Sequence, residues 1–139
     1  MERTRALAFV LDASVAVAWV VPSQATEYAR RIRLRAKREA FHVPVMFAAE
    51  VANVLVTLER RGSLSPQGAA AAADVLSRLQ PVEHGLNLTV AELRNLAGRY
   101  ALSAYDATYL ALALELRLPV ACGDRPLKAA LSRAGVKLA

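Results

Sequence analysis

Short apolar runs alternate with helical patterns along the chain, and this alternation constrains the fold more than any other feature. Residues 7–12, 41–44 and 119–123 have the length and composition of buried strands. The segments between them are too long for hairpin turns and carry helical patterns, so the strands are expected to pair in parallel with helices on both faces. We therefore expect an α/β fold: a three-layer α/β/α domain with a mainly parallel sheet of about five strands, forming a single domain over residues 1–139.

Capping and breaking residues set the other expected elements. Ser23 is expected to cap the second helix, Gly62 to end the third, and Ser65 to cap the fourth. No linker or low-complexity tract separates these elements. The expected helices are 14–21, 23–40, 45–61, 65–79, 89–101, 103–117 and 124–135, and the further short strands are 81–85 and 136–138.

The charge of the chain favours a polyanionic partner. Eighteen Lys and Arg residues stand against 12 Asp and Glu residues, which gives a formal net charge of +6. The excess is concentrated in residues 29–39, where Arg30, Arg31 and Arg35 lie. The apolar residues of this segment keep helical spacing, so the arginines form either the solvated face of an amphipathic helix or a surface that binds nucleic acid. The sequence of this helix favours the two interpretations equally.

Other features of the sequence limit the cellular compartment of the protein and the chemistry that its residues can carry out. No apolar stretch approaches the ~18 residues that span a bilayer, and the apolar run near the N-terminus meets an acid at Asp12, so we expect a cytoplasmic protein without a membrane partner. The single cysteine, Cys122, forms no internal disulfide and no cysteine zinc site, and its apolar surroundings predict burial. His42 and His84 lack the spacing of metal ligands.

Three of the four aspartates and one glutamate are candidate site residues, and each also has a structural interpretation. Asp12 and Asp124 stand where a predicted strand ends and a helix begins, an edge where parallel sheets bind ligands, but either could be an N-cap. Asp106 lies in the first turn of an apolar helix and could form a capping box with Ser103. Glu50 is the only charge between residues 43 and 58, yet it could belong to a solvent-facing stripe.

The four carboxylates together predict more than any one of them does. Carboxylates without a counter-charge repel one another, and a divalent cation removes that penalty. Mg²⁺ and Mn²⁺ prefer oxygen ligands, and such ions polarise a phosphodiester and activate water. A basic exterior beside an acidic pocket that holds metal fits an enzyme that cleaves nucleic acid.

Four motifs, in order, resemble those of the PIN-domain ribonucleases, and among these the VapC-type toxins of toxin–antitoxin pairs. The resemblance runs from Leu11 to about Leu131. Any one motif is weak, but four in this order in a chain of about the family's size are specific. The motifs are "LDASVAVAW", "AAEVANVL", "SAYDATYLALA" and "ACGDRPL".

The resemblance implies a PIN-like fold and a Mg²⁺- or Mn²⁺-dependent endoribonuclease that acts through a metal-activated water. Asp12 and Asp106 would be the inner metal ligands, and Glu50 and Asp124 would complete the acidic pocket. Ser14 and Asn53 match polar residues that support this quartet, and Trp19 matches a core or interface aromatic. The family also implies an RNA substrate, a homodimer and a cognate antitoxin whose tail covers the pocket.

One departure from the family pattern and several rival functions remain. Cys122 stands where the last motif commonly has Thr or Ser, and a thiol is a poorer hydrogen-bond partner than a hydroxyl. A housekeeping RNA-processing nuclease would share the fold and the acids with a toxin. A non-catalytic binding module would tolerate the loss of Asp106. A phosphotransfer receiver or phosphatase is disfavoured, because the first strand ends in "LDAS" without a paired acid and no glycine-rich phosphate loop follows.

Overall fold

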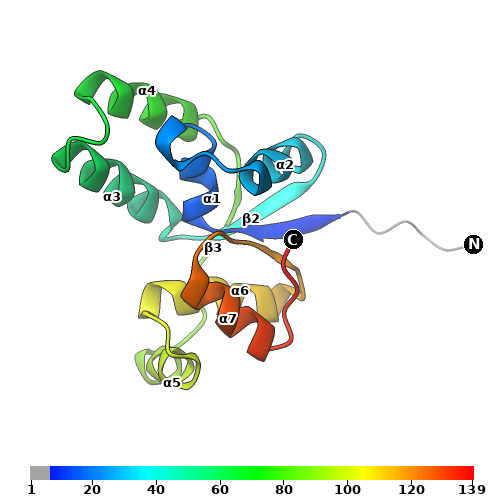
Figure 1. Ribbon diagram of the computed structural model, residues 1–139. Coiled ribbons are helices and arrows are strands. Elements are labelled where there is room, and N and C mark those ends of the chain that lie inside the picture. Colours follow the sequence, from blue (N-terminus) through cyan, green and yellow to red (C-terminus); the bar gives the residue numbers. More distant parts are fainter. Residues whose placement is uncertain (1–6) are drawn as a thin grey trace, which may run out of the picture.

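Four short parallel strands form the sheet at the centre of the molecule (Figure 1). The computed structural model describes residues 7–139. All three strand pairings are parallel, and the spatial order is β3-β2-β1-β4. This confirms the expected α/β class. The strands are β1 (Ala8–Leu11), β2 (Ala40–Pro44), β3 (Val82–His84) and β4 (Val120–Ala121).

The sheet has one strand fewer than the five we expected. The segment 136–138 reaches the free edge of β4 but pairs there only through a single parallel bridge between Val120 and Leu138. Two backbone hydrogen bonds, from Val120 to Lys137 and from Ala139 to Val120, hold the segment in place. Because β4 is only two residues long, it offers too few backbone groups for a full fifth strand.

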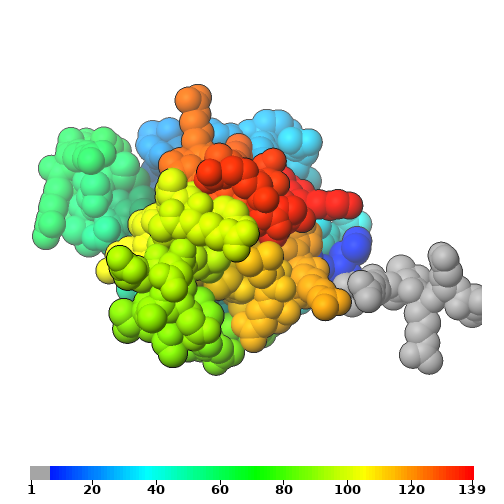
Figure 2. Space-filling model, turned by 90° about the horizontal axis from the view of Figure 1, so that it is seen from below, coloured from blue at the N-terminus to red at the C-terminus, as the bar shows by residue number. Residues whose placement is uncertain are grey.

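Helices cover both faces of the sheet, as a parallel sheet requires. In Figure 1, α1 to α4 lie on one side of the sheet and α5 to α7 on the other. Figure 2 shows α5, α6 and α7 together on the face seen from below. The helices are α1 (Ala13–Ala18), α2 (Glu27–Ala36), α3 (Phe47–Arg60), α4 (Pro66–Ser77), α5 (Val90–Tyr100), α6 (Ala104–Leu116) and α7 (Arg125–Arg133).

Most of the helix ends follow the capping residues of the sequence. The Ser65 side chain accepts a hydrogen bond at the start of α4, and Thr89 and Glu92 form a complete capping box on α5. Gly62 follows α3 with a φ of +73°, a left-handed conformation that glycine adopts without strain. The expected cap of the second helix is wrong: Ser23 lies in a separate 3₁₀ turn, and Thr26 caps α2 instead by accepting from the Ala29 N–H.

The core lies between the sheet and its two helical layers. Phe9, Val10 and Leu11 of β1 are fully buried, and Tyr109 of α6 and Leu127 of α7 close over them from the other side. Burying such side chains contributes about 1.5–3 kcal/mol each. The strand that carries most of the core is therefore also the one that delivers Asp12. Among residues 7–139, no helix combines the length and the apolar character that a bilayer span requires.

Candidate active site

The four acids expected to act together come from four different elements at one edge of the sheet. Asp12 directly follows β1, and Asp124 follows β4, the neighbour of β1. Glu50 lies in the first turn of α3, and Asp106 lies in the first turn of α6. The carboxyl ends of parallel strands and the N-termini of the following helices meet at the same edge, so the topology brings these residues together.

Asp12 is buried, with only 4% of its surface exposed, although it carries a carboxylate. It occupies the N-cap position of α1 but makes no side-chain capping hydrogen bond, so the capping interpretation does not explain it. Burial, together with the charges of Asp106 and Asp124, raises the pKa of Asp12 from 3.8 to about 6, although the hydrogen bond from Ser14 acts in the opposite direction. A buried acid without a cationic partner lowers stability, which is typical of a functional position.

Ser14 connects the two strand ends. Its hydroxyl donates to the Asp12 Oδ2 atom at 2.5 Å and accepts from the Gly123 N–H at 3.2 Å. The backbone N–H of Asp12 also donates to the Ala121 carbonyl at 3.0 Å. The hydroxyl that follows the first acid by two residues therefore orients that acid and ties it to the segment before Asp124.

Asp124 is a true N-cap. Its Oδ2 atom accepts from the Leu127 N–H at 3.1 Å at the start of α7. The same carboxylate raises the pKa of Asp12 and of Asp106 through its charge. Capping and a role in the site therefore do not exclude each other, since the second carboxylate oxygen remains for another ligand.

Asp106 and Glu50 are half-buried. The Asp106 N–H donates to the Ser103 hydroxyl at 3.1 Å, which is the first half of the expected capping box, but the described residues form no return bond from the Asp106 carboxylate. Burial comes first among the effects that raise the pKa of Asp106, and the charge of Asp124 adds to it. Burial, together with the charges of Asp12 and Asp106, raises the pKa of Glu50 to about 7. Because Glu50 is half-buried, it does not belong to a simple solvent-facing stripe.

The chemistry of this donor set suits a hard divalent cation. Every residue that shifts these pKa values through its charge is another carboxylate of the group, and each shift is upward. A cation would remove this repulsion. The carboxylates do not form a complete set of metal ligands in this conformation. Within residues 7–139, no three His, Cys, Asp or Glu side chains lie close enough together to hold a metal ion.

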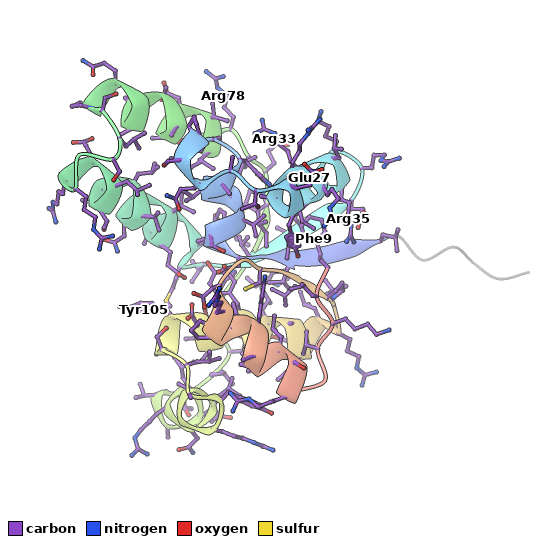
Figure 3. The ribbon with its side chains drawn as sticks, viewed as in Figure 1. Phe9, Glu27, Arg33, Arg35, Arg78 and Tyr105 are labelled. Atoms are coloured by element: carbon purple, nitrogen blue, oxygen red, sulfur yellow. The ribbon has the colours of Figure 1, made fainter. Side chains whose placement is uncertain are left out.

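A cleft of about 540 Å³ opens beside Glu50 and Asp106. Asn53, one of the residues expected to support the acids, is exposed on its wall. Tyr105 is 61% exposed on the α6 side of the cleft, and Figure 3 shows it projecting from the start of that helix. Asp12 and Asp124 are not among the lining residues. The cleft is lined by Met46, Ala49, Glu50, Asn53, Val54, Ser103, Tyr105 and Asp106.

Cys122 is fully buried, as the sequence predicts. Its Sγ atom lies 3.4 Å from the backbone carbonyl of Asp124, to which the thiol donates a weak hydrogen bond. Burial raises the pKa of this thiol to about 12, so it stays protonated and is not a nucleophile. The thiol thus supports the turn before α7 in the place where a hydroxyl is common in the family pattern.

The arginines of α2 lie away from the cleft. Arg30 and Arg31 are exposed, whereas Arg35 is paired with Glu39 at 2.8 Å and stacks over the Phe9 ring. Figure 3 shows Arg35 next to Phe9, toward the opposite end of β1 from Tyr105. Since α2 leads into the amino end of β2, its last turns lie at the sheet edge opposite the acids. Arg35 thus has a structural role.

Two features of the structure were not expected from the sequence. His42 and His84 are 42 residues apart, but the pairing of β2 with β3 places their ring nitrogens 2.8 Å from each other. Tyr109, which the sequence presents as one apolar residue of a helix, has a fully buried hydroxyl near the acids. Its position three residues after Asp106, on the same helix face, was the one available signal.

Comparisons with solved structures agree with this fold. The chain is similar to the crystal structure of PAE2754 from Pyrobaculum aerophilum, with a TM-score of 0.66 and 23% identity over 90% of this chain and 80% of that one. It is also similar to VapBC2 from Rickettsia felis, solved bound to a DNA fragment from their promoter, with a TM-score of 0.63 and 15% identity over 96% of this chain and 98% of that one.

Comparisons of sequence give the family. No curated protein sequence matches the chain. The model of the PIN domain family, however, matches residues 9–130, which include all four acids and all of the sheet except Ala8. This match covers most of the chain and confirms the resemblance that the four motifs indicate. The chain therefore belongs to the PIN domain family.

Proposed function

We propose that this chain is a Mg²⁺- or Mn²⁺-dependent endoribonuclease and the toxin component of a toxin–antitoxin pair of the VapBC type. The observation that carries the proposal is the buried Asp12 carboxylate, which makes no capping bond and has no cationic partner among residues 7–139. It lies among Asp106 and Asp124, whose charges raise its pKa. Membership of the PIN domain family supports the nuclease assignment.

Each acid has a distinct part in the proposed site. Asp12 and Asp106 would be the inner metal ligands, with Glu50 and Asp124 completing the pocket. When bound, the ion supplies Lewis-acid stabilisation of the phosphate and lowers the pKa of a bound water. Ser14 orients Asp12 through its hydrogen bond. The substrate strand would bind in the cleft beside Glu50 and Asp106, which Asn53 and Tyr105 also line.

The partners of the proposed enzyme follow from its surface and from its structural neighbour. The VapBC2 neighbour was solved as a complex, which supports a cognate antitoxin for this chain as well. The open cleft beside Glu50 and Asp106 is where an antitoxin tail would block the site. Exposed apolar side chains, among them Val90 at 88% and Leu114 at 44%, are consistent with a homodimer. We place the enzyme in the cytoplasm as a single domain over residues 1–139.

The first experiment incubates the purified, antitoxin-free chain with a mixed RNA pool, with and without Mn²⁺ or Mg²⁺. Asp106→Asn tests the site, because asparagine keeps the size of the side chain and removes its charge. Asp74→Asn is the matched control, since Asp74 is exposed on α4 and is not one of the four acids. We expect metal-dependent cleavage by the wild type and by the control, and none by Asp106→Asn.

Other outcomes favour the rival functions. Equal cleavage by wild type and Asp106→Asn contradicts the assigned site. A folded wild type that neither cleaves RNA nor binds Mn²⁺ in a calorimetric titration favours a non-catalytic binding module. Cleavage without host toxicity, and with no small adjacent reading frame for a DNA-binding antitoxin, favours a housekeeping RNA-processing nuclease.

A further inference from the structure

Two buried side-chain oxygens in residues 7–139 have no hydrogen-bond partner, and one of them belongs to an acid of the candidate site. They are the Oε1 atom of Glu50 and the hydroxyl of Tyr109. Glu50 and Asp106 line the same cleft, and Tyr109 lies one turn after Asp106 on the same face of α6, which brings its hydroxyl toward Glu50. The two unpartnered atoms are complementary, because a phenol donates a hydrogen bond and a carboxylate accepts one.

The position of Tyr109 makes an unpartnered hydroxyl unusual. The residue is 0% exposed and belongs to the core beneath the acidic edge. Buried tyrosine hydroxyls ordinarily find a partner, because an orphaned one has lost its hydrogen bonds to water. Phenylalanine would fill the same space without this loss. The hydroxyl therefore requires an explanation beyond packing.

The surroundings of the hydroxyl supply that explanation. Tyr109 is buried one turn after Asp106, and the charges of Glu50, Asp12 and Asp106 all raise the pKa of its hydroxyl. Burial raises this pKa most. The group therefore remains a hydrogen-bond donor within a cluster of acceptors.

Glu50 differs from the other acids in how its side chain is held. Asp12 accepts from the Ser14 hydroxyl, and Asp124 accepts from the Leu127 N–H. Glu50 has the longer and more flexible side chain, and Tyr109 is the one neighbour that favours its charged form against burial and the other acids. Among residues 7–139, no hydrogen bond fixes the direction of the Glu50 Oε1 atom.

We propose that Tyr109 is a positioning residue whose hydroxyl donates a hydrogen bond to Glu50 and directs its carboxylate toward Asp12 and Asp106. The inference rests on the proposed metal-dependent function, because it concerns the orientation of the Glu50 carboxylate as a ligand of the ion. In this arrangement, one side of the Glu50 carboxylate receives the hydroxyl and the other remains for the ion. Residues that orient metal ligands in this way typically change metal affinity by 10–100-fold when they are removed.

The test measures Mn²⁺ binding to the full chain by calorimetry, without RNA, so that it does not depend on activity. Tyr109→Phe removes only the hydroxyl. Tyr100→Phe is the matched control, because Tyr100 ends α5 and stacks with Arg99 and Arg133, and it shifts the pKa of none of the four acids. Glu50→Ala and the double variant Glu50→Ala/Tyr109→Phe complete a double-mutant cycle. Circular dichroism checks that each variant is folded.

We expect Tyr109→Phe to weaken Mn²⁺ binding by about tenfold or more. Tyr100→Phe should bind as the wild type does, and Tyr109→Phe should add little to the effect of Glu50→Ala. Wild-type affinity in Tyr109→Phe would overturn the role of Tyr109 alone. Equal losses with and without Glu50 would overturn the route through Glu50. A wild type that binds neither Mn²⁺ nor Mg²⁺ would overturn the metal site itself and this role with it.

A second measurement leaves Tyr109 unchanged. Mn²⁺ added to the wild type should perturb the ultraviolet absorbance of a buried tyrosine, because the Glu50 carboxylate that faces it becomes engaged. Glu50→Ala should reduce this difference spectrum, and Tyr100→Phe, which changes a tyrosine outside the cleft, should retain it. The same difference spectrum in wild type and Glu50→Ala contradicts the proposed coupling.

Discussion

The junctions from β1 into α1 and from β4 into α7 look alike in the sequence but differ in the structure. Each ends a strand with an aspartate at the N-cap position of the next helix. Asp124 uses a carboxylate oxygen to cap α7 through the Leu127 N–H. Asp12 makes no capping bond and is buried, with its pKa raised to about 6. One aspartate thus stabilises its helix, whereas the other costs folding free energy.

This difference separates an aspartate that has a structural role from one that has none. An N-cap aspartate contributes about 1 kcal/mol in many helices, so Asp124 has a structural reason to be there whatever else it does. Asp12 has no such reason, since asparagine or serine at an N-cap would avoid burying a charge. Ser14 joins the two junctions by contacting both Asp12 and the Gly123 N–H.

The sharpest test of the comparison is Asp12→Asn. We expect RNA cleavage to fall by at least about 100-fold, since a ligand to an ion that stabilises the transition state by several kcal/mol is lost. The metal-free variant should nevertheless be more stable than the wild type at neutral pH, because a buried charge has been removed. Cleavage assays and urea unfolding in EDTA measure both effects. A variant that is less stable and fully active would reverse our interpretation of Asp12.

The second prediction concerns the pH dependence of stability without metal. The unfolded chain loses the Asp12 proton near pH 3.8, whereas the folded chain holds it until about pH 6. The folded state binds more protons in this window, so the contribution of Asp12 to stability falls as pH rises from about 4 to 6, by on the order of 2–3 kcal/mol. The stability gap between Asp12→Asn and wild type should therefore widen over this range and then stay constant.

Urea unfolding in EDTA at several pH values measures this gap. Saturating Mn²⁺ should reverse the trend for the wild type above about pH 6, because the ion binds the ionised folded form. A constant gap between pH 4 and 7 would mean that Asp12 ionises as easily in the folded chain as in the unfolded one.

Substitution of Asp124 should have a smaller effect, and the choice of replacement should separate the effect on stability from the effect on cleavage. Asp124→Ala should lower the free energy of unfolding by about 1 kcal/mol because the cap is lost, whereas Asp124→Asn should keep most of this stability. If Asp124 also completes the acidic pocket, both variants should lose cleavage, though by less than Asp12→Asn does. Chemical unfolding separates the two variants, and cleavage assays compare them. Full activity in Asp124→Asn would leave Asp124 as a cap alone.

Ser14→Ala should have the smallest effect. Ser14 is exposed, so loss of its two hydrogen bonds should lower the free energy of unfolding by about 1 kcal/mol or less. Since its hydrogen bond opposes the upward shift at Asp12, the pKa of Asp12 should rise further in the variant. NMR titration of the Asp12 carboxyl measures this shift. An unchanged pKa would show that Ser14 holds the Gly123 segment without tuning the acid.

Much of the fold could be predicted from the sequence because its signals are local. Apolar runs located β1, β2 and β4, and Ser65, Thr89 and Gly62 marked helix ends by their own backbone and side-chain chemistry. The expected fifth strand does not form, because β4 is only two residues long and pairs with segment 136–138 through a single bridge. The cap at Ser23 was wrong because the 3₁₀ turn from Pro22 to Gln24 intervenes and leaves Thr26 to begin α2.

By itself, the sequence determined the class of fold and the family, and it singled out the four acids as candidates, since periodicity, caps and ordered motifs are written along the chain. Only the tertiary structure decided which aspartate caps and which is buried, that His42 meets His84, and that the Tyr109 hydroxyl and a Glu50 oxygen are buried. The physical reason is that burial, charge coupling and hydrogen-bond partnership depend on distances across elements. Those distances are set by strand order and helix packing, which residue spacing along one chain does not encode.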